Sequence, residues 1–179
     1  MAGIAGLGLN PDDPDSNRIF NAWLDGFDNS AINGSIVGYA ISPFAEQTIV
    51  HGGFQSMPFS YDNGVGKSEA TLSLTDTRDW TEEGVDLLSL WYYGDPSNSA
   101  EPMYLVLNGT AAVTNDNQNA TQEASWTEWR IDLQAFTDQG VNLATVNSIT
   151  LGFGNRANPV ADGSGLMYFD DIRLYRPTP

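Results

Sequence analysis

Apolar and polar residues alternate in short runs along this chain, and this pattern constrains its fold more than any other feature. The runs are bounded by glycine, asparagine, aspartate and proline, which favour turns. A period of two places successive side chains on opposite faces of a strand, and helical periodicity is nearly absent. We therefore predict an all-β protein, an antiparallel β-sandwich. The predicted strands are 55–61, 68–74, 87–93, 103–107, 127–133, 146–153 and 166–175.

The pattern is weaker in the first third of the chain. Residues 18–24 fit either a short strand or a helical turn, and residues 36–41 fit a further strand. Residues 115–125 are polar and rich in asparagine and glutamine, which indicates a long exposed loop. With 179 residues, the chain has the size of one domain. We expect an atypical segment over residues 1–16 and a single domain over 17–179.

Alternation also sorts the side chains of each strand into inward and outward sets. In 87–93 the outward set includes Trp91 and Tyr93, and in 127–133 it includes Arg130 and Asp132. Two sheets that each bury one apolar face are the natural arrangement of such strands. The expected core positions of three strands are Leu88, Leu90, Tyr92, Trp129, Ile131, Leu133, Ile149, Leu151 and Phe153.

The chain is strongly acidic, with 23 acidic residues against 7 basic ones and a net charge of −16. Such a surface repels phosphate groups, so neither nucleic acid nor an anionic membrane is an expected partner. It suits a neutral or cationic ligand, Ca²⁺ or a salty medium, and it also fits self-repulsion that only maintains solubility. No apolar run is long enough to insert into a membrane.

Two further features bear on the compartment. There is no cysteine, so disulfides and thiolate zinc sites are excluded. Residues 1–8 are too short for a signal peptide and lack its basic flank. We expect a secreted or cell-surface protein from which any export signal has been removed.

Catalysis has little support in the sequence. His51 is the only histidine and adjoins no serine or cysteine nucleophile motif, so neither a catalytic triad nor a two-histidine zinc site is supported. In so acidic a chain, a pair of carboxylates that catalyses hydrolysis is still an open alternative. Glu46, Glu69 and Glu101 are the first residues to test for it. We predict that the protein is not an enzyme.

The last predicted strand contains a carboxylate in an unusual place. Ile172 and Leu174 set the inward parity of this strand, and Asp170 shares that parity. An unpaired buried carboxylate is costly, so Asp170 should be protonated, bonded by backbone amides, paired with arginine, or bound to a cation. Ca²⁺ is the metal that best suits carboxylates combined with turn carbonyls. A structural Ca²⁺ and a metal-free, hydrogen-bonded Asp170 both remain open.

Outward-facing aromatic plates combined with planar polar groups predict a ligand-binding surface, because the rings can stack and the polar groups can form paired hydrogen bonds. The candidate ligand-binding residues are Trp91, Tyr93, Arg130, Asp132, Asp171 and Arg173. The alternative is that Trp91 packs beneath a loop such as 115–125 and that the charged residues form ordinary surface pairs. The other tryptophans, expected to anchor the core or loops, are Trp23, Trp80, Trp126 and Trp129.

The closing run YFDDIRLY at 168–175 resembles the last strand of calcium-containing jelly-roll carbohydrate-binding modules and of related LamG-like or galactose-binding-like sandwich domains. The resemblance covers about residues 17–176. This part of the chain is also similar to modules of large exported planctomycete-type proteins. It implies a jelly roll that binds a polysaccharide or glycan, with Ca²⁺ on Asp170 and with Asp171 facing outward. The other segments that carry it are 51–63, 68–70, 79–81, 88–96 and 126–133.

The N-terminus departs from that resemblance. Such domains usually begin with an acidic-aromatic strand whose carboxylate helps to hold the metal, whereas this chain begins MAGIAGLGLN. Asp12, Asp13 or Asp25 would have to replace that ligand. If the first strand position is vacant, residues 3–9 of another copy would fill it by strand addition. The second hypothesis is therefore an extracellular structural subunit that forms filaments through residues 1–10.

Overall fold

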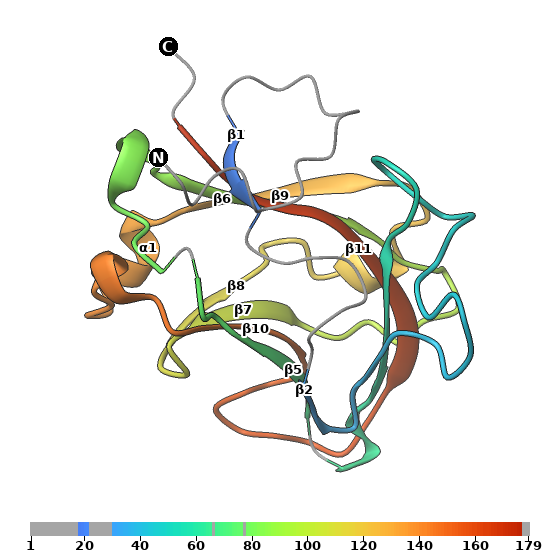
Figure 1. The fold of residues 1–179 in the computed structure, drawn as a ribbon. Coiled ribbons are helices and arrows are strands. Elements are labelled where there is room, and N and C mark those ends of the chain that lie inside the picture. Colours follow the sequence, from blue (N-terminus) through green and yellow to red (C-terminus); the bar gives the residue numbers. More distant parts are fainter. Residues whose placement is uncertain (1–17, 22–29, 66, 77, 177–179) are drawn as a thin grey trace.

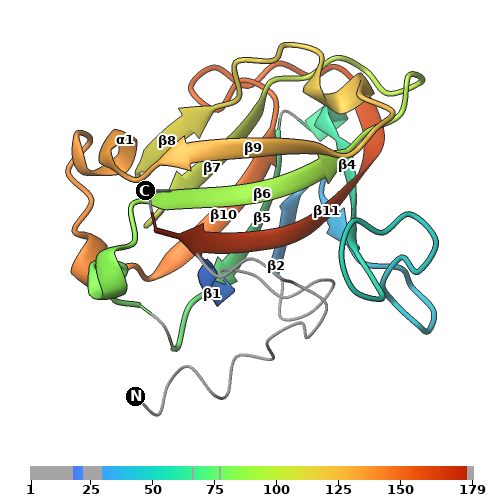
Figure 2. The same ribbon diagram turned by 90° about the horizontal axis from the view of Figure 1, so that it is seen from above.

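The computed structural model describes residues 18–21, 30–65, 67–76 and 78–176. Within these ranges, two antiparallel sheets pack face to face, so the predicted all-β sandwich of jelly-roll type is confirmed (Figure 1). Seen from above, one sheet lies over the other (Figure 2). Several sequence predictions lie outside the described residues, namely those on Asp12, Asp13, Trp23, Asp25 and the N-terminal segment 1–16.

The first sheet, sheet A, contains six strands. The last strand, β11 (Ser164–Tyr175), is its centre and pairs with β6 along one side. On its other side, the first half of β11 pairs with β4 and its last residues pair with β1. The remaining bounds are β1 (Arg18–Asn21), β3 (Ile36–Val37), β4 (Met57–Asp62), β6 (Leu87–Tyr93) and β9 (Thr127–Asp132).

The second sheet, sheet B, has the order β2-β5-β10-β7-β8. Its bounds are β2 (Ser30–Asn33), β5 (Ser68–Ser73), β10 (Ser148–Phe153), β7 (Met103–Leu107) and β8 (Ala111–Thr114). Helices in the described part are single turns: α1 (Gln134–Thr137), η1 (Asn63–Val65), η2 (Glu82–Gly84), η3 (Ala120–Gln122) and η4 (Leu143–Thr145).

All seven strands predicted with clear alternation are present, with small differences in their bounds. The open choice over 18–24 resolves to strand for Arg18–Asn21, which occupies the position beside the end of β11. The strand expected over 36–41 extends only over Ile36–Val37. The segment 115–125 is a connection, but it is not wholly exposed, because it contains η3 with its buried residues.

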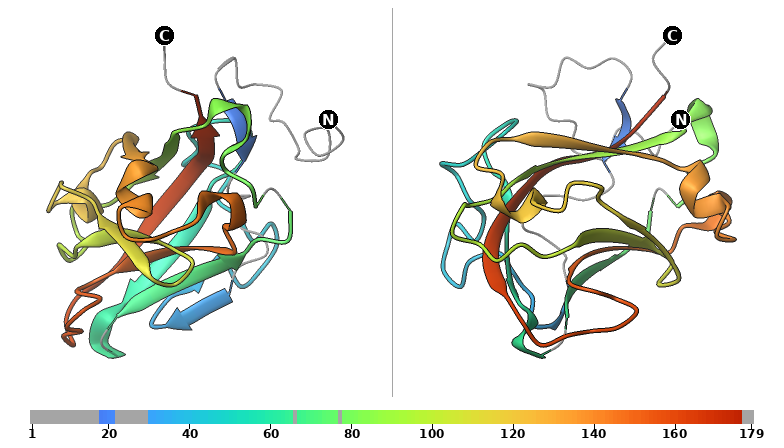
Figure 3. Two further views of the ribbon diagram at one scale, coloured as in Figure 1. Left: turned by 90° about the vertical axis from the view of Figure 1, so that its left-hand side faces the viewer. Right: turned by 180° about the vertical axis from the view of Figure 1, so that it is seen from behind.

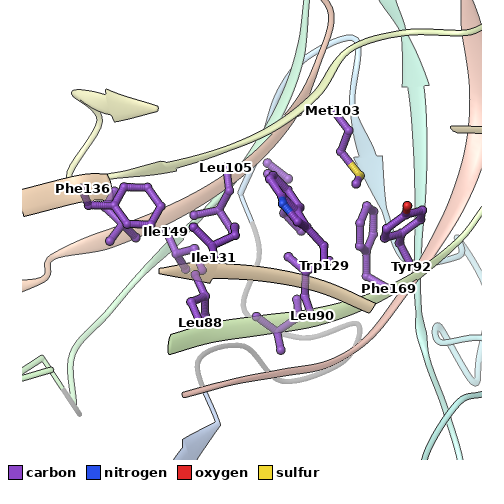
Figure 4. Close-up of a cluster of buried hydrophobic side chains, with 14 of the residues drawn as sticks. Leu88, Leu90, Tyr92, Met103, Leu105, Trp129, Ile131, Phe136, Ile149 and Phe169 are labelled. Carbon is purple, nitrogen blue, oxygen red and sulfur yellow. The ribbon is translucent and has the colours of Figure 1, made fainter. Parts of the chain in front are cut away.

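The core lies between the sheets and includes all of the predicted core side chains. Figure 4 shows Leu88 and Leu90 of β6 on the same side as Trp129 and Ile131 of the neighbouring β9. Every expected core residue of these strands and of β10 is buried, including Trp129 at 9% exposure. Trp80 is also buried, as predicted. The alternation therefore determined which faces of both sheets point inward.

A β-bulge in the middle of β11 changes the parity of this strand. Asp170 lies opposite Trp91 of β6, but the next paired residue, Arg173, lies opposite Ser89. Two residues of β11 thus face one residue of β6, and the first of them, Asp171, has a φ of 49°. Phe169, before the bulge, and Ile172, the second of the two bulge residues, both point into the core.

The prediction that Asp170 faces the core is therefore wrong. Counting back from Ile172 and Leu174 by twos assumes a regular strand, whereas the bulge inserts one residue and reverses the parity. The Asp170 side chain shares the outer face of sheet A with its cross-strand partner Trp91. Asp170 is nevertheless only 1% exposed. The loop between β3 and β4 covers it from outside, and Figure 3 shows this loop (teal, right panel) beyond the curved β11.

Candidate functional site

The six predicted ligand-binding residues lie on the outer face of sheet A. Strand pairing sets Arg173 opposite Ser89 and Ser89 opposite Arg130, which makes one row across β11, β6 and β9. Asp132 lies opposite Leu87, one row further along. Trp91 and Tyr93 occupy the rows on the other side of Ser89. The structure therefore brings the predicted set onto one face, as parity required.

Aromatic rings form a continuous series over this face. The imidazole of His51 stacks on Trp91 with ring centroids 3.8 Å apart and an angle of 16° between the planes. Trp126 meets both His51 and Tyr93 edge to face at 5.7 Å, and Tyr93 meets Tyr168 at 6.2 Å. We call these five residues the aromatic row. Trp126 is half-buried at this surface and was expected to anchor the core or a loop.

Charged groups lie between the aromatic row and sheet A. Asp171 contacts His51 Nδ1 through Oδ2 at 2.7 Å and pairs with Arg173 Nη2 through Oδ1 at 2.5 Å. Arg173 is 5% exposed, and this burial lowers its pKa. A Cβ atom at residue 52 would lie 2.7 Å from Asp171 Oδ2, so a larger residue would push this carboxylate and the loop apart. Asp171 therefore fixes His51 over Trp91.

Backbone amides surround the Asp170 carboxylate. Its Oδ2 accepts hydrogen bonds from the N–H groups of His51 and Gly52 at 2.8 and 3.0 Å, and its Oδ1 accepts one from Asp171 at 2.8 Å. Burial raises the pKa of Asp170 to about 6, and the charge of Asp171 adds to the rise, although the three amides act against it. Of the states considered from the sequence, the described contacts correspond to the amide-bonded one.

These contacts also bear on the calcium prediction. The groups that touch Asp170 in the described residues are N–H donors, and the adjacent Asp171 is engaged by His51 and Arg173. The described part of the chain contains no group of three or more histidine, cysteine, aspartate or glutamate residues suited to a metal. The described donor set therefore does not fit Ca²⁺ at Asp170 by itself. A site completed by Asp12, Asp13 or Asp25 stays a prediction.

The alternative prediction for Trp91, that it packs beneath a loop, is partly correct. The covering segment is the β3–β4 loop that carries His51, whereas 115–125 packs elsewhere, with the Glu123 carbonyl accepting from the Gly94 N–H at 2.7 Å. Trp91 remains partly exposed. It thus supports the imidazole from one side and still contributes surface to the row.

Sequence reasoning missed four contributors to this face, namely Trp126, Glu128, His51 and Tyr168. Glu128 accepts a hydrogen bond from the Ser89 hydroxyl at 2.7 Å and lies 4.0 Å from Arg130. The parity of Glu128 equals that of Arg130, so alternation could have found it. His51 and Tyr168 become neighbours of the face through a long-range loop contact and the bulge, which alternation does not report.

The glutamates proposed for a catalytic test lie in different parts of the fold. Glu46, in the β3–β4 loop, accepts a hydrogen bond from the Tyr39 hydroxyl at 2.6 Å. Glu69, on sheet B, pairs with Lys67 at 3.2 Å and Arg156 at 2.9 Å. Although burial opposes it, hydrogen bonds to Glu69 hold its pKa below the usual range. Glu101, just before β7, is buried. The contacts of Glu69 are those of structural ion pairs, and that of Glu46 is a hydrogen bond within its loop.

The fold defines the chain as a jelly-roll β-sandwich of the kind found in carbohydrate-binding modules. No protein-family model matches the chain, and no curated protein matches it. It is similar to a family 11 carbohydrate-binding module from Clostridium thermocellum in complex with a β-1,3-1,4-mixed-linked tetrasaccharide, at 19% identity and a TM-score of 0.53, covering 86% of this chain and 94% of that chain.

Two other solved structures are similar as well. A family 30 carbohydrate-binding module matches at 15% identity and a TM-score of 0.55, over 84% of this chain and 96% of that one. A β-1,2-glucanase from Parabacteroides distasonis matches at 18% identity and a TM-score of 0.57, over 86% of this chain but only 24% of the enzyme. At these identities the likeness establishes a shared fold.

Among the described residues, no helix has the length and hydropathy to span a membrane.

Proposed function

We propose that the chain is a non-catalytic glycan-binding module of an exported protein and that it binds its ligand along the aromatic row. The observation that carries this proposal is the continuous, partly exposed series of rings from His51 to Tyr168 on one face of a β-sandwich. The fold it shares with carbohydrate-binding modules supports the same conclusion.

The chemistry of the row suits sugar rings. The C–H groups of a pyranose pack against aromatic faces, while its hydroxyls need donors and acceptors at the edge of the plate. Glu128, Arg130 and Asp132 are exposed on the neighbouring β9 and supply both kinds of group. We assign the plate to the outward side of the aromatic row and the hydrogen-bonding edge to β9.

The polar contacts of Asp171 beneath the aromatic row serve to hold it in place. Asp171 holds His51 by its Nδ1 atom, and Arg173 neutralises the carboxylate in turn. A preorganised plate binds more tightly than a mobile one, because less side-chain entropy is lost on binding. In this proposal Asp171 and Arg173 are positioning residues, while Trp91, Tyr93, Arg130 and Asp132 face the ligand.

Affinity electrophoresis tests this function. The panel is mixed-linkage β-1,3-1,4-glucan, β-1,2-glucan and agarose, chosen from the ligands and enzymes named for structural neighbours. We expect at least one polysaccharide to retard the protein and Trp91→Ala to remove the retardation. Val160→Ala, an exposed apolar residue in the β10–β11 loop, is the matched control and should behave as the unaltered protein. Retardation that survives Trp91→Ala would exclude this face.

The filament hypothesis depends on residues 1–10, which lie outside the described part, and stays a prediction. The structure bears on it at one point. The position beside residues 173–175 of β11 is already filled by β1 of the same chain. A donated strand from another copy would therefore have to add elsewhere or displace β1.

A further inference from the structure

From Tyr93 onwards, the aromatic row crosses the strands of sheet A towards the β3–β4 loop. Tyr93 of β6 lies opposite Tyr168 of β11, and Tyr168 lies opposite Pro58 of β4. Beyond Pro58, the chain that leaves β3 continues this line, because the Gly38 N–H donates to the Pro58 carbonyl at 2.8 Å. The next residue, Tyr39, therefore lies at the far end of the aromatic row, where Figure 2 shows the loop (blue to teal) beside β11.

Tyr39 and Glu46 form a polar pair at this end of the aromatic row. The Tyr39 hydroxyl donates to Glu46 Oε2 at 2.6 Å. Burial raises the pKa of Tyr39, and the Glu46 and Tyr168 side chains, which are hydrogen-bonded to its hydroxyl, add to the rise. Tyr39 is therefore a neutral hydroxyl group that connects Glu46 to the last ring of the row. All three side chains belong to partly exposed residues.

The Glu46 carboxylate is charged and fixed in place. Its Oε1 accepts hydrogen bonds from the N–H groups of Thr48 and Ile49, the second at 3.2 Å. Although burial opposes it, the hydrogen bonds from Tyr39 and from these amides hold the pKa of Glu46 below its usual value. A charged acceptor forms stronger hydrogen bonds to hydroxyl groups than a neutral one does. Glu46 therefore presents a strong, preorganised acceptor at a partly exposed position.

The β3–β4 loop borders both ends of the aromatic row. Its base is closed by two backbone hydrogen bonds, from the Glu46 N–H to the Ser56 carbonyl at 3.0 Å and from the Ser56 N–H to the Glu46 carbonyl at 2.9 Å. This bridge separates a first part that carries Tyr39 from a second part that carries His51. His51 stands at one end of the aromatic row and Tyr39 at the other. One rigid loop thus sets the positions of both groups before any ligand binds.

We propose that Tyr39 and Glu46 form a second hydrogen-bonding subsite for the glycan, whose chain crosses the strands from Trp126 to Tyr39. This inference rests on the proposed function, because it extends the same site. β9 supplies the hydrogen-bonding edge at the Trp126 end, and the Tyr39–Glu46 pair supplies one at the other end. The fixed carboxylate accepts from sugar hydroxyls and repels uronates and sulfates, so this subsite takes a neutral sugar unit. Only a chain that spans the row reaches both edges.

The dependence of affinity on glycan length tests this subsite. The probes are the disaccharide and the hexasaccharide cut from the polysaccharide that retards the protein, whether mixed-linkage β-1,3-1,4-glucan, β-1,2-glucan or agarose. By calorimetry, Glu46→Gln should weaken hexasaccharide binding roughly tenfold, because a charge-assisted hydrogen bond is lost. Disaccharide binding should stay within about twofold, since the large tryptophan rings at the other end hold short fragments.

Two more variants complete the measurement. Tyr39→Phe removes the hydroxyl that holds Glu46 and should give the same split between the two fragments with a smaller loss. Ile41→Ala, an exposed residue in the same part of the loop, is the matched control and should retain both affinities. If Glu46→Gln fails to fold, Tyr39→Phe alone decides.

The outcomes separate this subsite from the function on which it rests. Equal losses for both fragments would overturn the subsite, because the substitutions would then disturb the whole loop. Unchanged hexasaccharide affinity in Glu46→Gln and Tyr39→Phe, with binding still removed by Trp91→Ala, would overturn it and leave the proposed function intact. An unaltered protein that binds none of the three polysaccharides would overturn both.

Discussion

Asp170 should make a large contribution to the change in the free energy of unfolding between about pH 4 and pH 6. Its pKa is raised from an ordinary value of 3.8 to about 6, chiefly by burial. The difference of about 2 units corresponds to about 3 kcal/mol. Between these two pH values the folded state binds the proton more tightly than the unfolded state. The contribution of Asp170 to the free energy of unfolding is therefore largest below about pH 4 and falls as the pH rises through 6.

Urea unfolding of the unaltered chain and of Asp170→Asn, followed from pH 4 to pH 7 in the presence of a chelator, measures this contribution. The amide cannot ionise, so the variant should lack the decline of about 3 kcal/mol that Asp170 contributes. Subtracting the two profiles cancels the acidic groups that do not interact with Asp170. At low pH the variant should be the less stable protein, because its Nδ2 cannot accept the hydrogen bond from the Asp171 N–H. Parallel profiles over the whole range would refute the reasoning.

Three substitutions test other parts of the account. Gly52→Ala places a Cβ atom 2.7 Å from Asp171 Oδ2 and should displace the His51 loop, which glycan titration would register as at least a severalfold loss of affinity with little change in melting. Gly152→Ala brings a Cβ atom 2.4 Å from the Tyr104 ring on sheet B and should lower the melting temperature without weakening glycan binding. Leu90→Ala, in the core, should cost about 3 kcal/mol in urea unfolding; a cost below about 1 kcal/mol would contradict the packing described.

The strands that alternation predicted well are those with unbroken alternation and a large buried face. In β6, residues 88, 90 and 92 are buried and residues 91 and 93 are half-exposed, as a half-buried strand requires. β2 and β8 were missed because SAIN and AAVT are short and carry few of the large apolar residues that mark a buried strand. Their place in sheet B depends on pairing with β5 and β7.

The candidate site was predictable in its outward set but not in its details. Trp91, Tyr93, Arg130 and Asp132 follow from parity alone. The bulge at Asp171 was missed, although the buried residues change from odd positions before it to even positions after it, because Leu166 and Tyr168 also fit the even parity. The stacking of His51 depends on a contact with a residue 120 positions away in sequence, made possible by a glycine that approaches a carboxylate.

The most direct test of the aromatic row is the nuclear magnetic resonance of the tryptophan indole N–H groups during titration with a polysaccharide fragment. The chain has five tryptophans, and Trp80 and Trp129 are buried within the core. We predict that the indole signals of Trp91 and Trp126 shift with saturation while those of Trp80 and Trp129 stay in place. Saturable binding that leaves Trp91 and Trp126 unshifted would contradict the account.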